Sequence, residues 1–501
     1  MYIINPTRKH SYSRPLNIFL DTHNSEIKEL VNIIFNKYFN AEENVILKKH
    51  LEVLVLDLYI AWNTDPKLEI VIHMSPNSYT LVKRYNQLNI TKKMIDIVSV
   101  LINHDLIIGH EGLENNTKIT YICASLTLEN YFKKIKVSVF DISQYQELII
   151  LKDNAKKDID YEDNSKTKNI RKVLEQYNEI LRKTFIDIPF LEKSYLEYKG
   201  RKYNVNQHSK LVKKIFSNGS FDDGGKFYGG WWQRISEKQR EKILMDDRET
   251  IEIDYKSLHP VLAYAKKGID FWERTNTTKY SYFNDSYDVS ISGIKDKEDS
   301  RAVVKLLFLT ALNTNSEQEC FHKFRNQWDY ELHSYKGLFS DIFLQELLDS
   351  IRDRHYQIDD LFCSGNGLDL QKLDNEIIEY IVGDFTERNL PILCNNDSFI
   401  IWKEQLDLLV NNMQTAIKWV IGGIVENSQI QSNQFNILAF KDHILRNIDK
   451  SIPDQSYYSD SIMKSSISSD RCEGYIERWD NHKSYFYEKY DHSKQLSLIH
   501  I

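Results

Sequence analysis

Apolar and polar residues alternate along Thr250–Asp254 (TIEID), which is the pattern of a half-buried β-strand. A turn over Ser257–Pro260 follows, and the apolar spacing of Val261–Ala265 (VLAYA) then predicts a helix. Asp254 is therefore expected where the strand ends. A carboxylate held there by a rigid strand can face a cleft and bind a divalent cation, although an Asp at a strand end also commonly caps the next helix.

A second carboxylate stands in LPILCNNDSFIIW (390–402), where two apolar runs flank Asn395, Asn396 and Asp397. Two short strands joined by an Asn-rich turn predict a β-hairpin with Asp397 at its tip. The same residues also fit an ordinary Asn-Asp turn that has no chemical role.

Between these two acids lies RAVVKLLFLTALN (301–313), whose apolar spacing predicts a helix. Arg301 and Lys305 are four residues apart and share one face, which Leu309 and Asn313 continue. Two cations on one face can bind a triphosphate, or they can form the solvated face of an otherwise buried helix. Because apolar residues closely surround the basic row, we expect it to be shielded from bulk water.

The order of strand-Asp, helix with R-x-x-x-K and hairpin-Asp resembles motifs A, B and C of the family A DNA polymerases and of their relatives, the single-subunit RNA polymerases of phages and mitochondria. The likeness runs from about Asn218 to Trp402 and includes the glycine-rich segment GGKFYGGWWQRIS (224–236). It implies an α+β fold in which a right-hand palm and fingers with an antiparallel sheet follow a helical thumb-like region. The activity that it implies is template-directed nucleotidyl transfer on a primer–template with nucleoside triphosphates.

The family's motifs imply a role for individual residues of this chain. Asp254 and Asp397 match the two metal-binding, catalytic aspartates, and the Arg–Lys pair matches the residues that bind the incoming triphosphate. In the glycine-rich segment, Lys226 matches the primer–template arginine and Gln233 the glutamine that contacts the duplex. Gln371 resembles the glutamine of the Leu/Ile-Gln pair that approaches the primer terminus, although it also fits a polar helix start.

Three positions depart from the family's pattern. Asn396 stands where motif C has a histidine, and His259 stands where motif A of the DNA enzymes has a glutamate. Asn313 with the following threonine replaces the Tyr-Gly of motif B. His259 and Asn313 therefore occupy the positions that read the nucleotide's sugar, and they leave the choice between deoxynucleotides and ribonucleotides open.

The chemistry of nucleotidyl transfer agrees with the resemblance. It uses two metal ions about 4 Å apart, which activate the primer 3′-hydroxyl and stabilise the pyrophosphate leaving group. We expect two Mg²⁺ ions, with Mn²⁺ as an alternative, because carboxylates and phosphates are hard oxygen ligands. The sequence offers no His/Cys cluster that would predict a zinc site.

Upstream, the predicted order of helix, helix and hairpin is that of a winged helix. A helix is expected after Thr91, and LIIGHEGLENNTKITYIC (106–123) reads as two strands joined by a polar loop. Lys92 and Lys93 would begin a recognition helix that binds DNA, and Lys118 would lie on the wing. The same fold can serve protein contacts or act as a scaffold.

These patterns define the expected domains. They are an N-terminal segment (1–44), a winged-helix-like module (45–140), a boundary loop with the helical thumb-like region (141–217), the palm and fingers core (218–435) and a C-terminal polar extension (436–501). The D-x-E sequence at Asp160–Glu162 lies in a polar run rather than on an apolar strand. No proofreading exonuclease is therefore expected.

Composition limits where the protein acts. The 501 residues carry a net charge of −7, so a nucleic-acid surface has to be a local basic patch within an acidic whole. Five cysteines occur singly, which favours reduced thiols inside a cell. Without a signal peptide or a long apolar run, a cytoplasmic protein with no membrane association is expected.

The sequence leads to a DNA polymerase of a phage or mobile element as the first hypothesis. The nearest alternative is a single-subunit RNA polymerase or primase. An alternative of another class is a non-catalytic DNA-binding replication initiator or regulator, in which the winged helix acts and the palm is only structural. The presence of both Asp254 and Asp397 argues against that last alternative.

Overall fold

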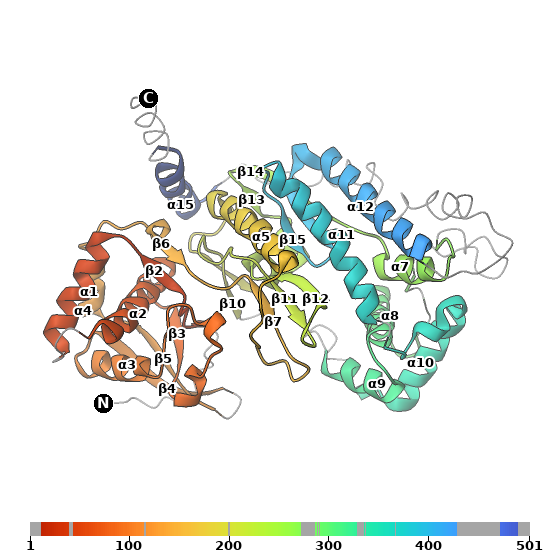
Figure 1. Cartoon of the computed structure of the whole chain (residues 1–501), viewed down its shortest axis with the longest axis horizontal. Helices are drawn as coiled ribbons and strands as arrows, with labels where there is room; N and C mark the ends of the chain where they lie inside the picture. The colour runs from red at the N-terminus through yellow and green to blue at the C-terminus, as the bar shows by residue number, and fades with distance from the viewer. Residues whose placement is uncertain are drawn as a thin grey trace. The chain divides into compact units, whose positions relative to one another are not determined.

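The computed structural model describes residues 12–39, 44–114, 117–198, 201–271, 286–287, 289, 291–327, 335, 337–365, 367–427 and 471–488. The fold is mixed α+β with several small sheets (Figure 1). The chain forms two compact units. The first comprises Met1–Ile215, Phe227–Thr250 and Ile467–Ile501, and the second comprises Phe216–Lys226 and Ile251–Ser466.

The first unit begins with helices packed on a four-stranded sheet of order β1-β3-β5-β4. Its elements are β1 (Ser13–Pro15), α1 (Ser25–Tyr38), α2 (Val45–Thr64), β3 (Glu69–His73), α3 (Lys93–Asn103), β4 (Ile107–Glu114), β5 (Thr117–Ala124) and α4 (Leu126–Phe132). The predicted helix before β3, the helix after Thr91 and the antiparallel hairpin β4–β5 are all present. Between β3 and α3 there are two short 3₁₀ turns, Pro76–Tyr79 and Lys83–Tyr85.

The rest of the first unit is built from short strands around one long helix. The helix is α5 (Ser165–Lys183). The strands are β2 (Leu20–Thr22), β6 (Ile142–Gln144), β7 (Ile149–Leu151), β8 (Ile186–Asp187), β9 (Tyr195–Tyr198), β10 (Arg201–Asn204), β11 (Lys213–Ser217) and β13 (Leu244–Met245). Helix α5 lies in the segment where the sequence predicted a helical region, and Asn164 caps its start. Strands β11 and β12 (Ser220–Tyr228) each pass from one unit into the other.

A C-terminal helix, α15 (Glu473–Lys483), also belongs to the first unit. The Tyr475 side chain is fully buried and packs with Phe185 and Leu244. Arg478 donates to the buried Asp187 carboxylate over 2.7 Å. The sequence predicted only a polar extension here, and the described part of that extension is a packed helix.

The second unit contains the end of β14 (Arg248–Asp254), the hairpin β15 (Leu393–Asn395) and β16 (Ser398–Trp402), in the order β15-β16-β14. Its helices are α7 (Leu258–Lys266), α8 (Lys297–Leu312), α9 (Glu317–Asn326), α10 (Asp341–Arg354), α11 (Gly367–Glu387) and α12 (Leu406–Asn427). The predicted strand, hairpin and helix are thus confirmed. Helix α7 packs against α11 and α12, which run side by side (Figure 1).

Across the described ranges, none of the helices is both long and apolar enough to cross a membrane.

Candidate active site

The two predicted catalytic carboxylates lie at one edge of the β15-β16-β14 sheet. The Ser398 hydroxyl, at the start of β16, donates to Oε1 of Glu252 over 2.6 Å, so the start of β16 lies beside the end of β14. Asp254 is two residues beyond Glu252, and Asp397 directly precedes Ser398. The strand and the hairpin therefore bring both acids to the same edge.

Local geometry explains why each acid is held at this edge. The buried Tyr255, next to Asp254, donates its hydroxyl to the Met413 carbonyl oxygen over 2.8 Å and so anchors the strand end on α12. In the hairpin, Asn395 pairs with Ser398, which leaves a two-residue turn. Its first residue, Asn396, has a φ of 54°, a left-handed conformation that asparagine tolerates well.

Asp397 lies within electrostatic reach of three other charged side chains. Burial raises the pKa of the Asp397 carboxyl, and the negative charge of Asp374 raises it further. The positive charges of His259 and Lys305 act in the opposite direction. Burial also raises the pKa of Tyr255 well above its ordinary value, with smaller contributions from the charges of Asp374 and Asp397. Charges from three separate helices, α11, α7 and α8, thus act on the Asp397 carboxyl.

Asp374, on helix α11, is the residue that the sequence reasoning missed. Only 1% of its side chain is exposed, and Nζ of Lys226 lies 3.2 Å from its Oδ2. Nε2 of His259 lies 3.9 Å from the same oxygen. The sequence does contain a signal, because Asp374 follows Gln371 by three residues and so shares its helix face.

The predicted basic pair lies on α8, one helical turn apart. Cζ of Arg301 lies 5.3 Å, and Nζ of Lys305 6.0 Å, from the centre of the Tyr287 ring. Both side chains are exposed, so the expectation that apolar neighbours shield them from water was wrong. Val303, Val304, Leu307 and Phe308 are buried on other faces of the helix and leave the basic row open.

Asn313 and Gln371 contact each other directly. Nε2 of Gln371 donates to Oδ1 of Asn313 over 2.5 Å, and Nδ2 of Asn313 donates to the Leu309 carbonyl over 2.7 Å. Gly367 is packed so closely against Asn313 that a Cβ atom would meet its Oδ1 at 2.4 Å. The end of α8 and the start of α11 are therefore in close contact through Asn313, the residue expected to contact the nucleotide's sugar.

Gln233 is engaged within its own turn. Its Oε1 accepts from the Gly229 amide over 3.0 Å, and its Nε2 donates to the Phe227 carbonyl over 3.1 Å. These bonds brace a turn in which Gly229 has a φ of 138°, a conformation that favours glycine. Gln233 belongs to the first unit and Lys226 to the second. A contact of Gln233 with a duplex remains a prediction.

The three lysines predicted to bind DNA lie in the N-terminal part of the first unit. Lys92 is exposed directly before α3, and Lys93 is the first residue of that helix. Lys118 lies on β5, opposite Leu113 of β4 in the strand register. Lys93 thus lies on the expected helix and Lys118 on the expected hairpin, while the winged-helix assignment and the role of these lysines in DNA binding stay predictions.

The two carboxylates at this edge of the sheet are possible ligands of a metal ion. Among the residues that the structure describes, no group of three or more His, Cys, Asp or Glu side chains is arranged to hold a metal ion. Asp254 and Asp397 supply two hard carboxylates, and Mg²⁺ is commonly bound by one or two carboxylates together with substrate phosphates and water. Two carboxylates alone would leave most of the coordination shell of Mg²⁺ to water or to a bound phosphate.

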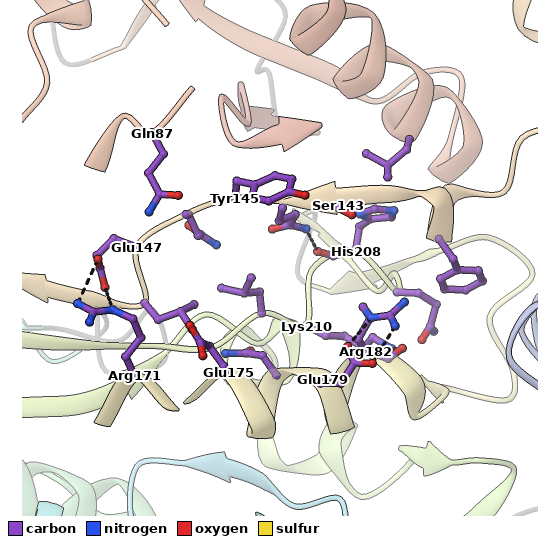
Figure 2. A pocket seen from close by; sticks show the side chains of 18 of the residues that line it. Gln87, Ser143, Tyr145, Glu147, Arg171, Glu175, Glu179, Arg182, His208 and Lys210 are labelled. Atoms are coloured by element: carbon purple, nitrogen blue, oxygen red, sulfur yellow. Dashed lines mark hydrogen bonds and ion pairs between the residues drawn. The ribbon is translucent and has the colours of Figure 1, made fainter. Parts of the chain in front are cut away.

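A polar cavity of about 710 Å³ lies elsewhere, in the first unit (Figure 2). Its charged side chains are largely paired with one another, as Arg171 is with Glu147 at 3.0 Å and Arg182 with Glu179 at 2.8 Å. Lys210 donates to the Thr184 carbonyl over 2.7 Å at the end of α5, and burial lowers its pKa to about 7. None of the predicted site residues lines this cavity.

No model of a known protein family matches the chain. No curated protein matches it either.

Proposed function

We propose that this protein is a template-directed nucleotidyltransferase, a DNA polymerase of a phage or mobile element. The observation that carries this proposal is the convergence of four residues that the family's motifs single out. Nζ of Lys226 and Nε2 of His259 lie 3.2 and 3.9 Å from Oδ2 of the buried Asp374, and the charges of Asp374, His259 and Lys305 all act on Asp397. Sequence order alone does not require such a meeting, so it supports the polymerase interpretation over four unrelated motifs.

The parts of the site have complementary roles in this proposal. Asp254 and Asp397 would hold two Mg²⁺ ions, which when bound supply activation of the primer 3′-hydroxyl and charge stabilisation at the leaving pyrophosphate. The exposed pair Arg301 and Lys305 binds the anionic triphosphate through charge-assisted hydrogen bonds. Lys226 binds a phosphate of the primer strand.

A single-subunit RNA polymerase or primase is the alternative within the same class. It is favoured by one observation, the imidazole of His259 at 3.9 Å from Asp374. An imidazole oriented by a carboxylate can donate a hydrogen bond, and a donor at this position can bind a 2′-hydroxyl as well as exclude one.

The N-terminal module is proposed to bind duplex DNA as a winged helix. The order α2, β3, α3, β4, β5 with sheet order β3-β5-β4 supports this, because a helix precedes a hairpin that forms a wing. The non-catalytic initiator or regulator would use this module alone. It would bind DNA and incorporate no nucleotide.

Extension of a labelled primer on a template of known sequence tests the proposal. The purified protein is incubated with Mg²⁺ and one nucleotide at a time, in deoxy and ribo forms. We expect addition of only the deoxynucleotide that is complementary to the template. Addition of ribonucleotides alone would move the protein to the RNA polymerase or primase class, and no addition of any nucleotide with intact DNA binding would favour the initiator.

A further inference from the structure

One face of helix α11 contacts two different parts of the second unit. Gln371 donates to Asn313 at the end of α8. Asp374 pairs with Lys226, and Asn375 donates to the Gly224 carbonyl, both in the glycine-rich segment. Residues three and four apart on a helix lie on the same face, so this arrangement is continuous. Helix α11 thereby links the glycine-rich segment to the proposed nucleotide-binding helix.

Asp374 is the charged centre of that face. Both of its carboxylate oxygens are buried, and neither makes a hydrogen bond among the described residues, so its charge is balanced by proximity to Lys226 and His259. A carboxylate out of water needs such compensation, because leaving it alone is costly. The ammonium group of Lys226 is therefore held at one place rather than moving freely in solvent.

We propose that Asp374 is a positioning residue, which fixes the Lys226 ammonium beside the His259 ring so that Lys226 meets the primer-terminal phosphate in a single orientation. This inference rests on the proposed function for the identity of the phosphate. The holding of Lys226 by Asp374 stands on the geometry alone. A misplacement of about 1 Å in such a contact can lower a rate by about 10²-fold.

The chain offers a matched control on the same helix. Lys266 pairs with Asp369 at 2.8 Å, and the side chains of Lys266 and Lys226 are equally exposed, at 23%. The partners differ, because 68% of the Asp369 side chain is exposed and only 1% of the Asp374 side chain is. A surface ion pair of this kind is worth little, whereas a buried carboxylate holds its partner strongly.

The first measurement is lysine acetylation of the folded, full-length protein, followed by mass spectrometry. Acetylation requires the nitrogen to leave its carboxylate, so Lys226 should react at least ~10-fold more slowly than Lys266 in the unaltered protein. Asp374→Asn should raise the rate at Lys226 and leave Lys266 unchanged, whereas Asp369→Asn should change the rate at Lys266 little and leave Lys226 unchanged. Equal rates at both lysines in the unaltered protein would overturn the proposal, and that comparison needs no variant to fold.

The second measurement is single-turnover incorporation together with the primer–template Kd. Asp374→Asn should slow incorporation by about 10²-fold while the Kd stays the same or falls, because removing a negative charge does not weaken phosphate binding. Lys226→Gln should slow incorporation similarly, and the double variant should be no slower than the slower single variant, since both changes remove one interaction. Independent, multiplicative losses would overturn the positioning role. Slow acetylation of Lys226 in a protein that incorporates no nucleotide would refute the proposed function and leave the holding of Lys226 by Asp374 intact.

Discussion

The ammonium nitrogen of Lys226 lies 3.2 Å from Oδ2 of the buried Asp374, so the glycine-rich segment and helix α11 share one ion pair. His259 approaches the same oxygen, and the charge of Asp374 acts on Asp397 at the hairpin tip. The site is therefore a set of coupled charges in which each position depends on the others. Substitutions within it are expected to be non-additive.

The basic row on α8 yields a prediction about nucleotide binding. Lys305→Ala should raise the nucleotide KM by about 10- to 100-fold, since one hydrogen bond to a charged group contributes roughly 1.5–3 kcal/mol. The primer–template Kd should change less than twofold, because the phosphates that Lys305 binds belong to the incoming nucleotide. Lys323→Ala on α9, whose lysine pairs with Glu319 at 2.7 Å, is the control and should change neither constant. A weaker DNA Kd with an unchanged nucleotide KM would assign Lys305 to the duplex instead.

The N-terminal module yields a prediction about salt. Replacing Lys92, Lys93 and Lys118 together by alanine should flatten the dependence of log K on log salt by about 2.7, since each phosphate contact contributes roughly 0.9 on B-DNA. Binding to duplex DNA is measured by fluorescence anisotropy over a range of salt concentrations. An unchanged slope would mean that the module contacts protein rather than DNA.

Sugar selection yields a prediction about His259 and Asn313. If His259 excludes the 2′-hydroxyl by bulk, His259→Ala should admit ribonucleotides and leave deoxynucleotide use nearly unchanged. Asn313→Ala should act mainly through the loss of its bond with Gln371 and lower incorporation of both sugars alike. The ratio of kcat/KM for the two sugars is the measurement. If the parent enzyme prefers ribonucleotides and either variant loses this preference, the substituted side chain binds the 2′-hydroxyl rather than excluding it. The protein would then belong with the RNA polymerases or primases.

The buried His482 yields a prediction about acid stability that is independent of function. Its ring is surrounded by Phe140, Phe185, Trp479 and Phe486. Burial lowers its pKa from 6.5 to about 3. As the pH falls below about 6.5, His482 of the unfolded chain binds a proton, whereas His482 of the folded protein stays neutral until the pH approaches 3. The contribution of the neutral His482 ring to the free energy of unfolding is complete above pH 6.5. It is lost as the pH falls toward 3, by at most about 1.4 kcal/mol per pH unit.

His482→Phe should remove this slope, because phenylalanine fits an aromatic cluster and does not titrate. Urea denaturation at pH 7.5 and at pH 5 measures the effect. The variant should lose less stability than the parent between the two pH values. Identical losses in both proteins would show that His482 is not the group that titrates.

The local parts of the site could be predicted from the sequence because short-range patterns determine them. Alternation placed the strand that ends at Asp254, and the Asn-rich turn placed Asp397 at a hairpin tip. Helical spacing placed Arg301 and Lys305 on one face of α8. The exposure of that face was predicted wrongly, since apolar neighbours in sequence do not reveal which side of a helix the core covers.

Long-range packing could not be predicted in the same way. Asp374 stands among polar residues (KLDNE, 372–376) that suggest a solvated helix, and only the packing of α11 against the glycine-rich segment buries it. Likewise, nothing near Tyr475 in the sequence indicates that α15 packs with Phe185, which lies about three hundred residues earlier in the chain.

The most direct test of the account is metal-dependent nucleotide incorporation by Asp254→Asn and Asp397→Asn, measured in a single turnover on a labelled primer–template with Mg²⁺. Each variant should fold normally, bind primer–template and incorporate nucleotide at least ~10³-fold more slowly than the parent, a loss of about 4 kcal/mol of transition-state stabilisation. Glu404→Gln, in the short 3₁₀ turn that follows β16, is the control and should keep the parental rate. Incorporation by Asp254→Asn or Asp397→Asn at a rate near that of the parent would contradict the assignment of these two carboxylates as the catalytic centre.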